Sequence, residues 1–167
     1  MAEKINLAYL VSHPIQYQAP LLREIAALPD VSLKVFFCSD FSVQQYVDDE
    51  LGHTVQWDTP LLEGYEYEFL PALGKRSQIG RFSPFVYGMT HRLKKGNFKA
   101  LWVHGWFHWS HIWAILAAKH MGLRVFVRGE TNLHTETSGL LKSVVKERFL
   151  RWLFSKVDGF FAIGTWN

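Results

Sequence analysis

Three histidines lie close together near the middle of the chain, at positions 104, 108 and 111. Imidazole is a common metal ligand, and spacings of four and three would place three rings on one face of a helix. However, Gly105 stands where a helical zinc-protease motif carries its glutamate, and residues 100–103 form a short apolar run typical of a buried strand. We therefore expect His104 to end a strand and face a binding site, with His108 and His111 capping or flanking the next helix and no metal bound.

Aromatic side chains surround these histidines. Trp106 and Phe107 fall in the loop after the strand, where flat apolar rings would suit the CH-rich face of a sugar or a lipid. Trp102 and Trp113 fall at strand and helix positions that favour a place in the core. The pattern is suggestive of a carbohydrate or lipid site without being specific to one.

A second polar segment, Arg128-Gly129-Glu130-Thr131, follows the next apolar run. The Arg128 guanidinium could hold a phosphate or carboxylate through paired hydrogen bonds. The alternative is a structural ion pair between Arg128 and Glu130. Cys38, the single cysteine, ends another apolar run, where a small buried side chain is favoured over a nucleophile.

An alternation of strands and helices must position these residues. Strand patterns cover residues 4–11, 32–38, 66–70, 100–103, 125–127 and 159–163, and the segment 66–70 alternates. Helical patterns cover residues 18–28, 84–95 with Pro84 at the first position, the segment through Ile112 and Leu116 that Gly122 closes, and 140–157. This order predicts a doubly wound parallel α/β sheet, Rossmann-like, with right-handed crossovers. Ligands bind at the carboxyl ends of such strands, where His104 and Arg128 are expected.

Several common sites are not indicated. The loop after the first strand, residues 12–17, has the sequence SHPIQY, with no glycine to let the backbone approach a pyrophosphate. The chain also lacks a Walker loop and a Gly-x-Ser-x-Gly nucleophile elbow. The sequence therefore does not predict NAD binding in the usual manner, P-loop chemistry or α/β-hydrolase chemistry.

Length and composition indicate one globular domain. The 167 residues carry a formal charge of +3, which is too mild to argue for nucleic acid. Apolar runs are too short for a membrane span, the first residues do not resemble a signal peptide, and a single cysteine fits a reducing compartment. We expect a cytoplasmic protein. The basic helix predicted at 140–157 suits either solvent or peripheral contact with the inner face of an anionic membrane.

Four segments carry a resemblance to a known family: KINLAYLVSHPIQYQAPLLREIA, VQWDTPLLEGYEYEFLP, LWVHGW and KVDGFFAIGTWN. With the order of elements, they resemble the N-terminal domain of a family 4 glycosyltransferase of the GT-B fold, over essentially the whole chain. The resemblance implies that residues 1–167 are one half of a GT-B architecture, the acceptor-side Rossmann-like domain. A C-terminal domain with most of the nucleotide-sugar site is then expected outside this chain.

The resemblance also implies roles for particular residues. His104 matches a catalytic histidine beside the donor sugar, and Gly105 and Trp106 follow it in the same loop. Many relatives have a glycine pair in the loop after the first strand, and this chain has His13-Pro14 instead. The side chains expected to contact substrate there are His13, Gln16 and Tyr17. The segment expected to line the acceptor side contains Arg128, Glu130, Thr131 and Asn132.

The function implied by the resemblance is metal-independent transfer of a sugar, with retention of configuration, from a nucleotide-sugar donor to a saccharide or glycolipid acceptor. No cofactor is expected, and the isolated domain is expected to be inactive. One alternative is a stand-alone module that binds a sugar or nucleotide without catalysis. Another is a metal-dependent hydrolase built on His104, His108 and His111.

Overall fold

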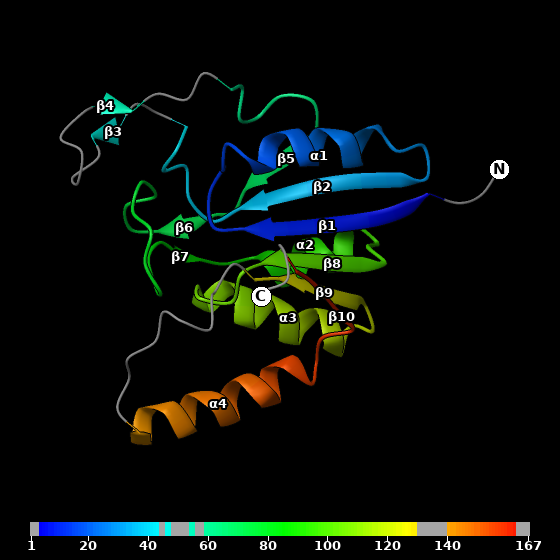
Figure 1. Cartoon of the computed structure of the whole chain (residues 1–167). Helices are drawn as coiled ribbons and strands as arrows, with labels where there is room; N and C mark the ends of the chain where they lie inside the picture. Colours follow the sequence, from blue (N-terminus) through cyan, green and yellow to red (C-terminus); the bar gives the residue numbers. More distant parts are fainter. Residues whose placement is uncertain (1–3, 44–45, 48–53, 56–58, 130–139, 163–167) are drawn as a thin grey trace.

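A six-stranded parallel sheet forms the centre of the protein (Figure 1). The computed structural model describes residues 4–43, 46–47, 54–55, 59–129 and 140–162. The strand order is β10-β9-β8-β1-β2-β5, and every described pair in this sheet is parallel. The strands are β1 (Ile5–Val11), β2 (Val31–Phe37), β5 (Glu66–Phe69), β8 (Ala100–His104), β9 (Arg124–Arg128) and β10 (Gly159–Phe161). All six predicted strands are confirmed, with small shifts at their ends.

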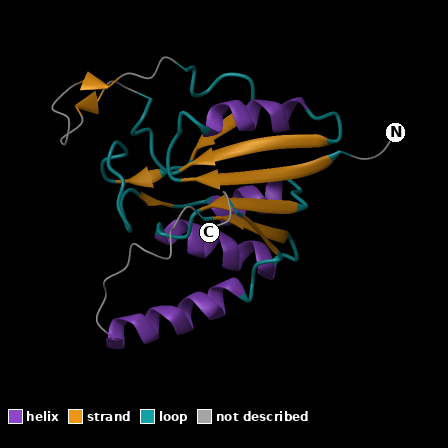
Figure 2. Cartoon of the chain, in the orientation of Figure 1, coloured by secondary structure: helices purple, strands orange, loops and turns teal. Residues whose placement is uncertain are grey.

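Helices cover both faces of the sheet (Figure 2). They are α1 (Gln18–Ala27), α2 (Met89–Lys95), α3 (Trp109–His120) and α4 (Leu140–Phe154). Alternate residues of β1 belong to different cores: Ala8 and Leu10 pack in a cluster with side chains of α2, α3 and α4, whereas Tyr9 and Val11 pack with Leu22 of α1. Side chains alternate across a strand, so α1 lies on one face and the other helices on the opposite face. The predicted doubly wound α/β fold is therefore confirmed.

One helix boundary differs from the sequence prediction. Pro84 does not begin a helix, because Phe85–Val86 forms β7, which pairs antiparallel with β6 (Ala72–Leu73). The chain then turns at Gly88, whose φ of 81° favours glycine, and α2 begins at Met89. The sequence around Pro84 is typical of a helix start. However, Phe85 and Val86 pair with Leu73 and Ala72, and this pairing places them in a strand instead. A second small ladder joins β3 (Tyr46–Val47) and β4 (Thr54–Val55).

The two tryptophans predicted to lie in the core differ from each other. Trp102 is partly buried and packs against Tyr9 and Phe161, with ring centroids 5.2 and 4.4 Å away. Trp113 is 53% exposed, which contradicts the prediction. Helix α3 turns Ala114, Ile115 and Ala118 toward the sheet, so Trp113 lies on the outer side of the helix.

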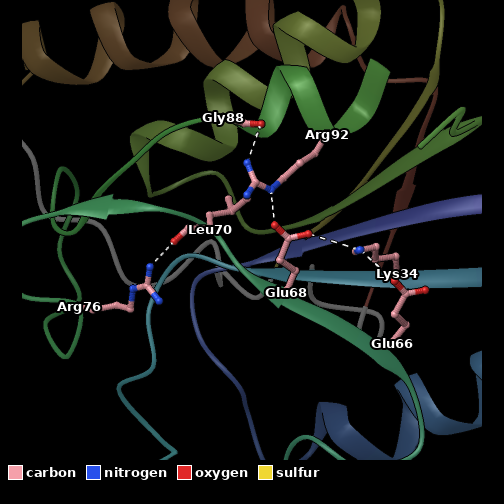
Figure 3. A network of polar contacts seen from close by, with 7 residues as sticks. All are labelled: Lys34, Glu66, Glu68, Leu70, Arg76, Gly88 and Arg92. Carbon is pink, nitrogen blue, oxygen red and sulfur yellow. Dashed lines mark hydrogen bonds and ion pairs between the residues drawn. The ribbon is translucent and has the colours of Figure 1, made fainter. Parts of the chain in front are cut away.

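Charged side chains fasten the edge strand β5 to its neighbours (Figure 3). Glu68 lies between two cations, with Arg92 Nε 2.5 Å from one carboxylate oxygen and Lys34 Nζ 3.3 Å from the other. Lys34 also pairs with Glu66 at 2.9 Å. Partial burial raises the pKa of Glu68, but hydrogen bonds and charge from Arg92 and Lys34 outweigh burial, so the pKa lies below its usual value. This network joins β2, β5 and α2.

We expect Glu68→Gln to lower the free energy of unfolding by about 1 kcal/mol at neutral pH, or the melting temperature by about 2 to 4 °C. A carboxylate with a lowered folded pKa stabilises the fold above its unfolded pKa of about 4.3, and this contribution disappears as pH falls through the folded pKa. The difference between wild type and variant should therefore shrink in acid. Thermal unfolding followed by circular dichroism measures it.

The matched control is Glu147→Gln, which removes an exposed pair with Arg151 one helical turn away. Its expected effect is within about 0.5 kcal/mol. Equal melting temperatures for wild type and Glu68→Gln at neutral pH would show that the network does not stabilise β5.

Candidate functional site

The candidate site lies between β1 and β8, where the order in which the chain adds strands to the sheet reverses. These strands are neighbours, but β1 leads to α1 on one face and β8 leads to α3 on the other. Such a switch point is where open α/β sheets bind their ligands, because the two following loops separate there. The loops are residues 12–17 and 105–108.

His104, the last residue of β8, is held by two side chains. It is 8% exposed, its Nδ1 lies 3.1 Å from the Tyr9 hydroxyl, and Gln18 Nε2 lies 2.8 Å from Nδ1 and 2.9 Å from Nε2 of the ring. The Tyr9 hydroxyl also donates to Gln18 Oε1 at 3.2 Å. Three elements, β1, α1 and β8, thus contribute to one buried polar cluster. The imidazole is oriented before any substrate binds.

Tyr9 and Gln18 are functional candidates that sequence reasoning missed. Gln18 is 1% exposed at the first position of α1, one turn before Leu22 on the same inward face. A glutamine at an inward helix position and a tyrosine within an apolar strand each need a buried hydrogen-bond partner. The sequence could therefore have indicated that Tyr9 and Gln18 each need a polar partner. It does not show that His104 is a partner of both.

The loop after β1 brings His13 near this cluster. The ring of His13 packs edge-on against Phe41 with centroids 5.8 Å apart, and its Nδ1 lies 2.8 Å from Ser12 Oγ. Burial, together with the charge of His104, lowers the pKa of His13 to about 4. His13 is therefore uncharged near neutral pH and offers hydrogen bonds rather than positive charge.

Gln16 and Tyr17 occupy the outer part of the same loop. Gln16 Nε2 lies 3.5 Å from Thr59 Oγ1, and Tyr17 is exposed. The loop is tied to the end of β2 because Ser39 N donates to Ser12 O at 2.7 Å. The structure thus places the predicted contacts His13, Gln16 and Tyr17 at one edge of the sheet. Their roles in binding stay predictions.

Gly105 and Trp106 continue the chain after His104. Gly105 has φ +81° and donates its backbone N–H to Arg128 O at 2.7 Å, which joins the ends of β8 and β9. Trp106 is partly buried and meets Phe154 edge-on at 5.2 Å. A Cβ on Gly129 would come within 2.7 Å of the Trp106 ring. Trp106 therefore packs into the base of the loop, and its neighbour Phe107 is the ring presented to solvent.

Arg128 ends β9 directly beside His104 in the strand register. Its position therefore agrees with the prediction that it lines the same edge of the sheet. Glu130, Thr131 and Asn132 lie outside the described residues. The alternative of an ion pair between Arg128 and Glu130 likewise lies outside them.

The other two histidines have structural contacts. His108 is the N-cap of α3 and accepts a hydrogen bond from Ser110 N at 3.3 Å. His111, 2% exposed, has Nδ1 3.3 Å from Gly105 O. The three rings therefore do not share a helical face, since His104 belongs to a strand and His108 precedes the helix. Among the described residues, no group of three or more His, Cys, Asp or Glu side chains is arranged to hold a metal ion.

Cys38 is a buried side chain, as predicted. Its Sγ lies 3.3 Å from Ser110 Oγ. Burial, partly offset by this contact, raises the pKa of the thiol to about 12. A thiol in this state is a poor nucleophile at neutral pH.

The comparisons with known proteins bear on the fold. No protein-family model matches the chain, and no curated protein matches it. A search of solved structures finds a crystal structure of UDP-N-acetylglucosamine 2-epimerase, with a TM-score of 0.55 and 16% sequence identity. The match covers 96% of this chain and 42% of the epimerase chain. This likeness supports a GT-B-like Rossmann fold, and it does not single out family 4 glycosyltransferases.

The part of the chain that the structure describes contains no helix that is both long and apolar enough to cross a membrane.

The buried histidines predict how stability changes with pH. Burial, with the charge of neighbouring His108, lowers the pKa of His111 to about 3, and that of His13 is about 4. An unfolded histidine has a pKa of about 6.5. Both lowered groups therefore stabilise the fold above pH about 6.5, and this contribution is lost as pH falls toward their folded values.

We expect the free energy of unfolding to fall by about 1.4 kcal/mol per pH unit for each histidine inside its window. Urea unfolding between pH about 7 and about 5 measures the slope. His111→Gln should reduce the slope, whereas His120→Gln, at the exposed end of α3, should leave it unchanged. Equal slopes for wild type and His111→Gln would contradict the prediction.

Proposed function

We propose that this chain is the acceptor-side domain of a sugar-nucleotide enzyme, and specifically of a retaining glycosyltransferase. The observation that carries the proposal is the His104 ring, fixed by Tyr9 and Gln18 at the switch point of the sheet. The fold, which is shared with a sugar-nucleotide epimerase, supports the broader class. The resemblance of four sequence segments to family 4 supports the transfer reaction.

In this proposal His104 contacts the donor sugar and is a hydrogen-bonding group rather than a nucleophile. A fixed polar group accelerates a reaction because it requires no reorganisation as charge develops in the transition state. Tyr9 and Gln18 are positioning residues, since they orient the ring from the core side. No metal or other cofactor is needed for this role.

The charge of the site limits what this domain contributes. Glycosyl transfer from a nucleotide sugar leaves a diphosphate, whose negative charge must be stabilised. His13 and His111 have lowered pKa values and are neutral at physiological pH, so of the three side chains His13, His111 and Arg128, only Arg128 carries a permanent positive charge. Stabilisation of the diphosphate by a second domain agrees with this distribution, and the present domain would chiefly receive the saccharide or glycolipid acceptor.

A second candidate follows from the solved structure that resembles this chain. That protein is a UDP-N-acetylglucosamine 2-epimerase, and epimerisation needs no acceptor. A domain that binds a sugar or nucleotide without catalysis is the third. Acceptor dependence distinguishes the first candidate from the second, and turnover of any kind distinguishes both from the third.

The test uses the protein expressed from its complete reading frame. UDP-, GDP- and dTDP-sugars are supplied with and without saccharide and lipid-linked acceptors, and nucleotide release and sugar products are measured. We expect acceptor-dependent nucleotide diphosphate release. His104→Ala should lower this rate by about 100-fold, the usual effect of removing a preorganised group at the reacting centre. Tyr9→Phe should lower it by about fivefold, the equivalent of one hydrogen bond.

The matched control is His120→Ala, which removes an exposed histidine at the far end of α3 and should leave the rate unchanged. Thermal unfolding of each variant separates loss of activity from loss of fold. Unchanged turnover in a folded His104→Ala protein would remove His104 from the mechanism. A changed sugar without an acceptor would favour the epimerase, and binding without turnover would favour the binding module.

A further inference from the structure

The positive charge of the chain is concentrated in one stretch. Residues 69–129 contain ten of the eighteen Lys and Arg residues and none of the fifteen Asp and Glu residues. The rest of the chain has eight basic and fifteen acidic residues, a net charge of −7. The mild overall charge of +3 therefore conceals a stretch of +10. A protein with this distribution presents a basic region to any anionic partner.

The same stretch displays apolar side chains to solvent on the β6–β7 hairpin. Leu73 pairs with Phe85 across the ladder, and Tyr87 lies two residues further along on the same side. All three are exposed, Leu73 by 63%, while Val86 points into the core. The inner side of the hairpin is therefore packed, and the outer side is apolar and open.

Aromatic rings extend this surface onto α3. Phe85 stacks on Trp109 with centroids 5.2 Å apart and planes 14° apart, and Trp109 lies 6.0 Å from Trp113. Phe82, which is 66% exposed, and Phe107 flank the stacked rings in sequence. The hairpin patch is defined here as Leu73, Phe82, Phe85, Tyr87, Phe107 and Trp113, all of them exposed.

Hydrogen bonds hold the hairpin in this exposed position. Arg76 donates from Nη2 to Leu70 O at 2.8 Å, and the Ser39 hydroxyl donates to Arg76 O. At the far side of the loop, Trp109 N donates to Arg81 O at 2.9 Å. The patch is thus fastened to β2 and to α3, and its apolar side chains are not simply the tip of an unanchored loop.

Basic side chains border the patch. Lys75 and Arg81 are exposed in the loop that joins β6 and β7. The acidic residues nearest in sequence to the hairpin are Glu66 and Glu68, and both are already paired with Lys34 or Arg92. Lys75 and Arg81 therefore place positive charge beside Leu73 and Phe82 in the same loop.

We propose that the hairpin patch docks the protein onto an anionic phospholipid surface. Exposed rings and Leu73 would lie at the boundary between headgroups and acyl chains, and Lys75 and Arg81 would contact lipid phosphates. Amphipathic surfaces with apolar residues beside Lys and Arg bind membranes in this way. A nucleic acid would use the rings and cations but gains nothing by stacking on aliphatic Leu73 or Ile79. The proposal does not depend on the reaction catalysed.

This surface differs from the basic helix predicted at 140–157, for which the sequence left open either a solvated face or membrane contact. On that helix Arg151 contacts Glu147 at 2.6 and 3.0 Å, so part of its positive charge is matched within the helix. Residues 69–129, which include the β6–β7 hairpin, contain no acidic residue. The two surfaces can be tested separately.

The experiment is sedimentation of the protein with phosphatidylcholine vesicles, with and without phosphatidylglycerol. We expect binding only to vesicles that contain phosphatidylglycerol, and weaker binding as salt increases. The double variant K75Q/R81Q should bind about 30-fold more weakly, since each basic residue near an anionic surface contributes about a factor of five. L73S/F82S should bind at least about tenfold more weakly, because two large apolar side chains are lost.

The matched control is V145S/R148Q, which removes one exposed apolar and one basic side chain from α4 and should bind as wild type. Unchanged thermal unfolding of all variants establishes that the fold is intact. The proposal would be overturned if the protein did not bind phosphatidylglycerol vesicles, or if binding were lost in the α4 variant but not in the hairpin variants. It would also be overturned if the protein bound an oligonucleotide but did not sediment with vesicles.

Discussion

Burial of β1 on both of its faces is the constraint on which the candidate site depends. Tyr9, Leu10 and Val11 have no exposed surface, and alternate residues of the strand pack into two different cores. Helices must therefore cover both faces beside β1, so α1 leaves in one direction and α3 in the other. The loops before these helices separate for the same reason, and His104 lies where they separate.

The same burial explains why His104 has a fixed orientation. A hydroxyl within a strand buried on both faces has no access to water, so Tyr9 needs a partner inside the protein. Gln18 has the same requirement on the inward face of α1. The His104 ring lies within hydrogen-bond distance of both side chains. A structural requirement of the core therefore orients a group at the edge of the sheet, and orientation before substrate binding is what a catalytic group requires.

The sequence was sufficient to predict the sheet because its central strands are short apolar runs, and because β5 alternates between acidic and aromatic residues. Runs such as residues 100–103 carry this information locally. The β6–β7 hairpin could not be predicted in the same way, because Phe85 and Val86 pair with residues more than ten positions earlier. The prediction that Trp113 lies in the core was wrong because α3 has apolar residues on all its sides, so its sequence does not show which side is buried. In the structure the buried side is the one that carries Ala114 and Ile115.

For the candidate site, the sequence indicated positions rather than contacts. It predicted that His104 and Arg128 would each lie at the carboxyl end of a strand, which is confirmed, and the structure adds that these two strands are neighbours. It did not indicate that Tyr9 and Gln18 would hold His104, because those contacts join residues 86 and 95 positions apart. The net charge of +3 is an average over the chain, so it does not show that residues 69–129 contain no acidic side chain.

The hairpin patch and the candidate site are connected through the end of β2. Ser39 donates its backbone N–H to Ser12 in the loop that carries His13, and its hydroxyl donates to Arg76 in the hairpin. The loop after β8 makes a second connection, because Trp109, five residues beyond His104, donates to Arg81. Two separate hydrogen-bonded routes thus fix the patch relative to the site. Any surface that the patch contacts would lie at a defined orientation to His104, and a substrate presented by that surface would reach the site from the carboxyl edge of the sheet.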